Sequence, residues 1–288
     1  MGVFKAIGQG IGTTFRKPRL LVILWVVNIV YAAAVAFPLV MIVQTELGHS
    51  YLGSNVRPFD LMGLGEALLK YQDAMPAVIG GLVVSGLLFL GLYVFLNGGI
   101  IGRLLDREGR TTLQTFFGDC GRYFWRFARL FLASLVFLIL TFGVILRVLS
   151  ALAGLWIENA STEWTSVILR NLHFFAALLL LSVVHMVFDY ARIAVVADEE
   201  TKVLRALHHA LNFLKKRFFR SWALYLLIVA GFVAGTVLFY AVFGLLSGPT
   251  VLFVLLGFVW MQLNVLFRIW VKALIFAAQA EFYRSHPY

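Results

Sequence analysis

Long apolar runs alternate with short polar segments along the whole chain, and the length of the runs sets the fold. A helix needs about 20 apolar residues to cross roughly 30 Å of hydrocarbon, and each run is at least that long. The pattern therefore predicts an all-α polytopic bundle of six transmembrane helices in three hairpins. The predicted spans cover residues 20–43, 76–101, 130–154, 171–197, 222–246 and 251–278.

Lysine and arginine lie mostly on one side of these spans. Cytoplasmic loops carry an excess of both residues, so both termini are expected in the cytoplasm. The opposite loops hold only Arg57, Lys70 and Arg170. The expected cytoplasmic segments hold Lys5, Arg16, Lys17, Arg19, Arg103, Arg107, Arg110, Arg122, Arg126, Arg129, Lys202, Arg205, Lys215, Lys216, Arg217 and Arg220.

A segment that mixes apolar and basic positions precedes each predicted hairpin. These segments cover residues 3–16, 111–129 and 201–220. A basic and aromatic amphipathic helix is expected to lie in the plane of the membrane interface. The chain then consists of three copies of one unit, an interfacial segment followed by two spans. Together they form one integral membrane domain, residues 1–288.

Composition supports membrane residence and excludes a soluble domain. The 288 residues are 61% hydrophobic and 13% charged, with a mean hydropathy of +0.91, whereas soluble domains are about half apolar and a quarter charged. The net charge of +10 does not indicate nucleic-acid binding, because the basic residues flank apolar spans. The single cysteine, Cys120, cannot form an intrachain disulfide.

The first span also has the ingredients of a signal peptide. A basic arm and an apolar core lead to Ala34-Val35-Ala36, which fits a cleavage site. The apolar run continues through Val43, which favours an uncleaved first helix. Both alternatives stay open.

Polar residues form a seam on one face of span four and another on span six. The seam residues are His185, Asp189 and Arg192 in span four, and Asn264, Arg268 and Lys272 in span six. Each set shares a face because a helix turns 100° per residue.

Asp189 needs a partner, because a charge in hydrocarbon costs about 2.5–3.5 kcal/mol even on a lenient scale. Asp189 and Arg268 lie about 12 and 15 Å from the cytoplasmic ends of their helices, so an ion pair between them is geometrically reasonable. Arg192, one turn away, is the other candidate partner. The seams therefore form either a cytoplasm-facing polar cavity or a buried ion pair that fixes helix register.

Other motifs restrict the function. The pairs Gly98/Gly102 and Gly231/Gly235 have the GxxxG spacing of close helix packing. His185 and Asp189 supply only two metal ligands, and there is no HExxH motif or cysteine pair, so no metal or other cofactor is expected. Without a Walker loop, a GxSxG motif or a large soluble domain, the protein is not expected to be an enzyme.

Three motifs carry a resemblance to a known group. They are KPRL at 17–20, FDYARIAVV at 188–196 followed by an acidic turn, and the basic amphipathic segment before span five. In these the chain resembles six-helix bacterial inner-membrane proteins, and most of all the membrane domain attached to some glycerophosphodiester phosphodiesterases. The resemblance implies the architecture and a location in the bacterial cytoplasmic membrane. No phosphodiesterase domain is present, so that activity is not implied.

The favoured function is a non-enzymatic scaffold or accessory protein that binds lipids or a partner. A membrane-protein partner or a second copy of the chain is expected beside the bilayer itself. The alternative is a transporter or permease for a small anionic solute, which would use the polar cavity between spans four and six. The residues expected to contact anionic headgroups are Arg122, Arg126, Arg129, Lys215, Lys216, Arg217 and Arg220.

Overall fold

The computed structural model describes residues 1–47, 75–106, 109, 111–158, 162–246 and 250–285. Nearly all of these residues are helical, and none of them lies in a strand. Six helices are long and apolar enough to cross a membrane, which confirms the predicted all-α, multi-pass architecture. At most 17% of the most apolar stretch of each is buried, so large apolar surfaces need lipid or another protein to cover them. The hairpin arrangement and the cytoplasmic location of the termini stay predictions.

The chain divides into two compact units. A large unit holds Met1–Leu21 and Val94–Tyr288, and a small unit holds Val22–Tyr93. That residues 1–288 form one integral membrane domain stays a prediction. Four of the basic residues named above lie outside the described residues, namely Arg57, Lys70, Arg107 and Arg110.

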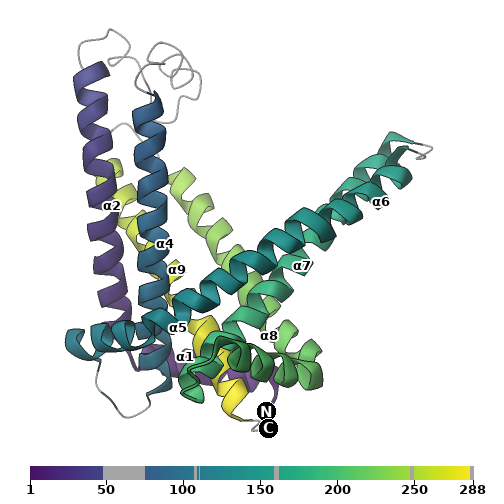
Figure 1. Cartoon of the computed structure of the whole chain (residues 1–288). Helices are drawn as coiled ribbons and strands as arrows, with labels where there is room; N and C mark the ends of the chain where they lie inside the picture. The colour runs from purple at the N-terminus through teal and green to yellow at the C-terminus, as the bar shows by residue number, and fades with distance from the viewer. Residues whose placement is uncertain (48–74, 107–108, 110, 159–161, 247–249, 286–288) are drawn as a thin grey trace. The chain divides into compact units, whose positions relative to one another are not determined.

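The small unit consists of most of α2 (Pro18–Leu47) and α4 (Met75–Leu105), which lie side by side (Figure 1). The Tyr31 hydroxyl donates a hydrogen bond to the carbonyl of Ser85. The Tyr31 ring also packs on Phe89, with ring centroids 5.3 Å apart. One tyrosine therefore joins the two helices through both its ring and its hydroxyl.

In the large unit, α1 (Val3–Phe15) packs along α9 (Val251–Arg284). Gly10 permits a close approach, because a Cβ at this position would lie 2.9 Å from the backbone nitrogen of Ala278. The indole of Trp270 donates a 3.1 Å hydrogen bond to the Thr14 hydroxyl. The predicted segment 3–16 is thus a separate helix, which ends before Pro18 begins α2.

The predicted boundary between residues 129 and 130 is absent. Instead α5 (Leu113–Leu140) runs without a break into the π-helical turn η2 (Thr141–Ile145) and then α6 (Leu146–Glu158). No proline or glycine lies between Arg122 and Leu140, so nothing in the sequence ends the helix there. The amphipathic segment and the span therefore form one continuous helix.

The return helix α7 (Glu163–Ala197) packs against both parts of this rod. The ring centroids of Phe137 and Phe188 lie 5.5 Å apart, and Ser150 Oγ lies 3.1 Å from His173 Nε2. The three helices form the arm labelled α5, α6 and α7 in Figure 1.

The helix α8 (Val203–Leu245) has a kink at Arg217, where φ is −142° and ψ is 28°. Its 43 residues would extend about 65 Å if straight, roughly twice the hydrocarbon thickness. The kink separates an N-terminal arm from the span, close to the boundary expected between residues 220 and 222. Beyond it α8 packs on α9, where Gly235 faces the ring of Phe267 and Trp260 Nε1 donates to the carbonyl of Phe239 at 2.9 Å.

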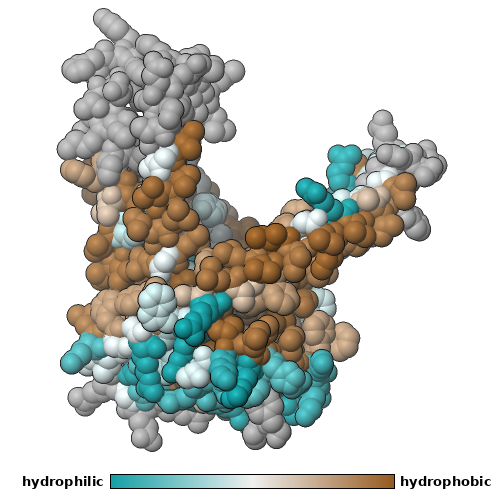
Figure 2. Space-filling view, in the orientation of Figure 1, coloured by the Kyte–Doolittle hydropathy of each residue, from teal (hydrophilic) through white to brown (hydrophobic). Residues whose placement is uncertain are grey.

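Hydrophilic side chains gather over the part of the large unit where α8 begins and α9 ends (Figure 2). The surface of the arm formed by α5, α6 and α7 is mostly hydrophobic in the same view. The three segments expected at the membrane interface meet at this polar end: α1 contacts α8, and Arg122 of α5 pairs with Glu199 in the turn before α8.

Candidate functional site

The ion pair of the predicted polar seam lies within α7. Arg192 Nη1 donates a 2.6 Å hydrogen bond to Asp189 Oδ1. Both residues are buried, with 8% of each exposed. The i, i+3 spacing places the two side chains on one face of the helix. Of the two partners expected for Asp189, the structure selects Arg192.

Two more seam residues contribute charge near this pair. Lys272, on the neighbouring helix α9, acts electrostatically on both Asp189 and Arg192. His185 acts on Asp189 from an exposed position one turn away. The structure therefore brings Asp189, Arg192 and Lys272 together and leaves His185 at their edge. The seam therefore combines two basic side chains with one carboxyl group.

The other two seam residues, Asn264 and Arg268 on α9, are not part of this charged group. Asn264 is buried, and its Oδ1 has no hydrogen-bond partner among the described residues. Arg268 is exposed and makes no hydrogen bond or ion pair with any described residue. The proposed pair between Asp189 and Arg268 is thus not formed.

The basic residues of α5 face the turn between α7 and α8. Arg122 Nη2 lies 2.8 Å from Glu199 Oε1, and Arg126 Nη1 donates to the Glu199 carbonyl at 3.4 Å. Glu199 adopts a left-handed backbone, with φ at 50°. Because the side chains of Arg122 and Glu199 are 54% and 64% exposed, their ion pair contributes at most about 1 kcal/mol. Arg129 is exposed as well.

Four of the basic residues of α8 lie close to its kink, on both sides of it. Lys215, Lys216 and Arg220 are exposed, whereas Arg217 is half-buried. The Arg217 guanidinium lies 5.8 Å from the centre of the Phe213 ring. Three of the four cations therefore face outward, and the fourth packs on the protein.

An aromatic cluster holds the first part of α8 against α7 and α9. Phe213 is 3% exposed, and its ring centre lies 5.2 Å from that of Tyr190 and 5.0 Å from that of Tyr283. The Tyr283 hydroxyl also donates to Asp198 Oδ2 at 2.8 Å. Leu214, on the apolar face of the amphipathic segment 201–220, is also buried with 3% exposed, while Leu204 on the same face is 80% exposed.

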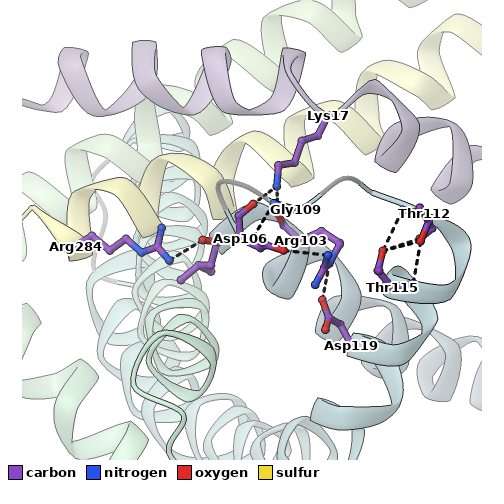
Figure 3. Close-up of polar contacts among 9 residues, drawn as sticks. Lys17, Arg103, Asp106, Gly109, Thr112, Thr115, Asp119 and Arg284 are labelled. Carbon is purple, nitrogen blue, oxygen red and sulfur yellow. Dashed lines mark hydrogen bonds and ion pairs between the residues drawn. The ribbon is translucent and has the colours of Figure 1, made fainter.

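Sequence reasoning missed a charged cluster at the end of α4 (Figure 3). Arg103 Nε donates to Asp119 Oδ2 of α5 at 2.6 Å, and Arg103 Nη1 lies 3.1 Å from Asp106 Oδ2. Gly102 leaves room for the carboxylate, because a Cβ there would lie 2.7 Å from Asp119 Oδ2. The cluster fixes the start of α5 on the last turn of α4.

Two cations from distant parts of the sequence complete the cluster. Lys17 Nζ donates to the carbonyls of Arg103 and Asp106, and Arg284 Nη2 donates to the carbonyl of Leu105 at 2.7 Å. The last carbonyls of a helix lack helical partners and form the negative end of its dipole, so cations stabilise them. Burial lowers the pKa of Lys17 below its ordinary value of 10.5, and the nearby Asp106 carboxylate opposes that effect.

The cluster borders a cavity of about 270 Å³. Its charged lining residues include Arg103, Asp106, Asp119, Arg122 and Arg284. Because Arg103 pairs with both carboxylates, this cavity offers little free charge to a ligand. In the sequence, the KPR turn at 17–19 is the one sign of this cluster, and by itself it indicates only where the first span begins.

Among the described residues, no group of three or more His, Cys, Asp or Glu side chains could hold a metal ion. No known protein family, curated protein or solved structure matches the chain. The likeness to the phosphodiesterase-associated membrane domain thus remains an expectation from the sequence.

Proposed function

We propose that the protein is a non-enzymatic scaffold or accessory protein of the bacterial cytoplasmic membrane, which binds anionic lipid headgroups through the basic helices at its polar end. Six membrane-length helices support residence in a bilayer. Both termini then lie in the cytoplasm, on the side where anionic lipids attract Lys and Arg.

One observation carries the proposal, the composition of the surface at the kink of α8. Lys215, Lys216 and Arg220 are exposed there, next to Phe219, which is 78% exposed. Cations beside an exposed aromatic ring at the start of a span match the headgroup region, where apolar side chains insert and basic side chains meet phosphate. Each cation near an anionic surface contributes about 1 kcal/mol.

The first half of α5 provides a second surface of the same kind. Trp125 is 70% exposed, and Arg129, one turn further on, is exposed as well. Arg122 and Arg126 are tied to Glu199 and contribute less free charge. Lipid contact on α5 therefore centres on Trp125 and Arg129.

The test compares the lipid shell of two variants. The chain is reconstituted in a zwitterionic bilayer with a minority of phosphatidylglycerol, and spin-labelled lipids report which headgroup is enriched beside the protein. Lys215→Gln/Lys216→Gln/Arg220→Gln is expected to lower the enrichment of the anionic lipid. Salt is expected to lower it in the unmodified chain, because these charges are exposed. Arg217 is left in place because it packs on Phe213.

The control removes cations at the opposite end of the membrane helices. Arg147 and Arg170 are also exposed, and Arg147→Gln/Arg170→Gln is expected to leave the enrichment unchanged. Equal enrichment in the α8 variant and the unmodified chain contradicts the proposal.

The buried seam favours one alternative function, a permease for a small anionic solute. Asp189 and Arg192 of α7 are grouped with Lys272 of α9, so two basic side chains lie near one carboxyl group. In that case Lys272 and Arg268 contact the anion, Asp189 and Arg192 gate it or couple protons, and Asn264 orients it. The permease requires Arg268→Ala to abolish uptake by proteoliposomes while the protein still folds, and unchanged uptake removes Arg268 from the pathway.

A further inference from the structure

The helix α1 presents three different faces. Ala6, Gly10 and Thr14 are buried, and the last two contact α9. Phe4 and Phe15, which are 80% and 67% exposed, lie on a second, apolar face. The third face is polar and rich in glycine, and consists of Lys5, Gly8, Gln9, Gly12, Thr13 and Arg16. These six positions recur every three or four residues and so form one stripe along the helix.

This third face forms one wall of an open cleft in the large unit. The cleft has a volume of about 1210 Å³. Its other lining residues come from the start of α2, the segment before α5, and the end of α9: Lys17, Pro18, Arg19, Gly109, Thr111 and Glu281. We call it the α1 cleft.

Three cations of the α1 cleft are not used by the fold. Lys5, Arg16 and Arg19 are exposed and make no hydrogen bond or ion pair with any described residue. A fourth cation, Lys17, is occupied by the end of α4. Among the described lining residues, Glu281 is the one carboxylate. The cleft therefore has an excess of positive charge, and two of its free cations are arginines, which suit bidentate contact with phosphate.

Two glycines make room for a ligand along the helix surface. A Cβ at Gly8 or at Gly12 would have no atom of the described residues within 4 Å. Packing against the described part of the chain does not require glycine at these positions, and glycine costs a helix about 1 kcal/mol relative to alanine. Gln9 and Thr13 beside them supply side-chain hydrogen-bond donors. A bare helix surface flanked by donors and cations permits an anion to approach the backbone closely.

We propose that the α1 cleft binds a phosphate-bearing anion, with Lys5, Arg16 and Arg19 as its charge partners. The exposed Phe4 and Phe15 place the helix at the level of the headgroups, so the phosphate of a lipid can reach the cleft from the bilayer. A soluble phosphate compound offers the same chemistry from the aqueous side. The site gives the proposed lipid-binding function a specific pocket, and it rests on that function only for the position of α1 at the membrane surface.

The test uses the full chain in nanodiscs of zwitterionic lipid and counts bound anions by native mass spectrometry. In one arm, phosphatidylglycerol is titrated into the nanodisc; in the other, inorganic pyrophosphate is added to the solution. One saturable anion per chain is expected. Retention of the lipid in the presence of pyrophosphate identifies a headgroup site, whereas displacement identifies a site open to soluble phosphate.

Two variants test anion binding by the cleft in independent ways. Lys5→Gln/Arg16→Gln/Arg19→Gln removes the three free cations, and Gly12→Leu fills the cleft without changing charge. Each is expected to weaken binding at least about tenfold, the size of one lost charge-assisted hydrogen bond. Gly118→Leu is the matched control, because Gly118 on α5 is equally open but does not line the cleft.

Both variants are expected to fold, so a loss of binding can be assigned to the cleft. The substituted side chains have no described partner, and Gly12→Leu raises helix propensity, so a loss of binding with unchanged thermal unfolding locates the site. Unchanged binding in both variants overturns the inference. Lys215→Gln/Lys216→Gln/Arg220→Gln is expected to lower general enrichment of anionic lipid and to leave the saturable anion bound, which separates this inference from the proposed function.

Discussion

Arg192 and Asp189 form a 2.6 Å hydrogen bond within one helix, and both are buried. A single substitution there leaves a buried charge without its hydrogen-bonded partner, which costs about 3–5 kcal/mol. Arg192→Met is therefore expected to lower the stability of the detergent-solubilised protein by an amount in this range, measured by chemical unfolding.

The exchange Asp189→Arg/Arg192→Asp restores the pair and is expected to recover most of that stability. Exchange of Asp189 with Arg268 is not expected to do so, because Arg268 makes no ion pair with a described residue. Recovery by the Arg268 exchange alone contradicts this arrangement.

The close approach of α1 to α9 predicts opposite effects at two glycines of one helix. Gly10→Ala places a methyl group 2.9 Å from the Ala278 backbone, which cannot yield as a side-chain end does, so this variant is expected to lower the melting temperature. The methyl group of Gly12→Ala meets no atom within 4 Å among the residues the structure describes, so this variant is expected to raise stability by up to about 1 kcal/mol. Thermal unfolding of the pair checks the prediction, and equal shifts in both variants count against the packing.

The contact between Gly99 and Cys120 predicts a change in thiol reactivity. A Cβ at Gly99 would lie 2.5 Å from Cys120 Sγ and 2.6 Å from the Phe116 ring, and Cys120 is fully buried. Gly99→Val is expected to separate α4 from α5 and to speed maleimide alkylation of Cys120. If opening becomes easier by ~1.4 kcal/mol, the rate rises about tenfold. Gly118→Val, in open space, is expected to leave the rate unchanged.

The lowered pKa of Lys17 predicts a pH dependence of stability. Burial is its main cause, so the folded protein binds fewer protons at this site than the unfolded chain does between the lowered pKa and 10.5. Stability then rises with pH across this window and is lost as pH falls through the lowered pKa. The stability of the unmodified chain relative to Lys17→Met is expected to increase as pH approaches 10.5. If the difference in stability between the two proteins does not change with pH, this result contradicts the lowered pKa of Lys17.

The sequence predicts the parts of this fold that depend on local pattern. Apolar length locates the six membrane helices, Pro18 marks the end of α1, and the acidic turn after Ala197 marks the end of α7. The pair of Asp189 with Arg192 was predictable because its members lie one turn apart. The continuity of α5 past Arg129 is not predicted by the sequence, because the change in composition at this point does not mark a change in the direction of the chain.

The parts of the fold and of the site that the sequence does not predict depend on contacts between distant segments. Lys17 is 86 and 89 residues from the carbonyls that it caps, and Arg284 is 179 residues from Leu105. In the sequence these cations look like ordinary flanking charges. The exposure of Arg268 was equally unpredictable, because a shared face and a matching depth do not fix how two helices are rotated about their axes.

The composition of the lipid shell tests the proposed function most directly. The protein is extracted with its surrounding membrane in an amphipathic polymer, and native mass spectrometry records its intact mass and the lipids it retains. We expect retained anionic lipid at a higher proportion than in the bulk membrane, and a return toward the bulk proportion in Lys215→Gln/Lys216→Gln/Arg220→Gln. A shell identical to the bulk membrane in both proteins contradicts lipid binding by α8, and a stoichiometric small solute that is lost on Arg268→Ala supports the permease instead.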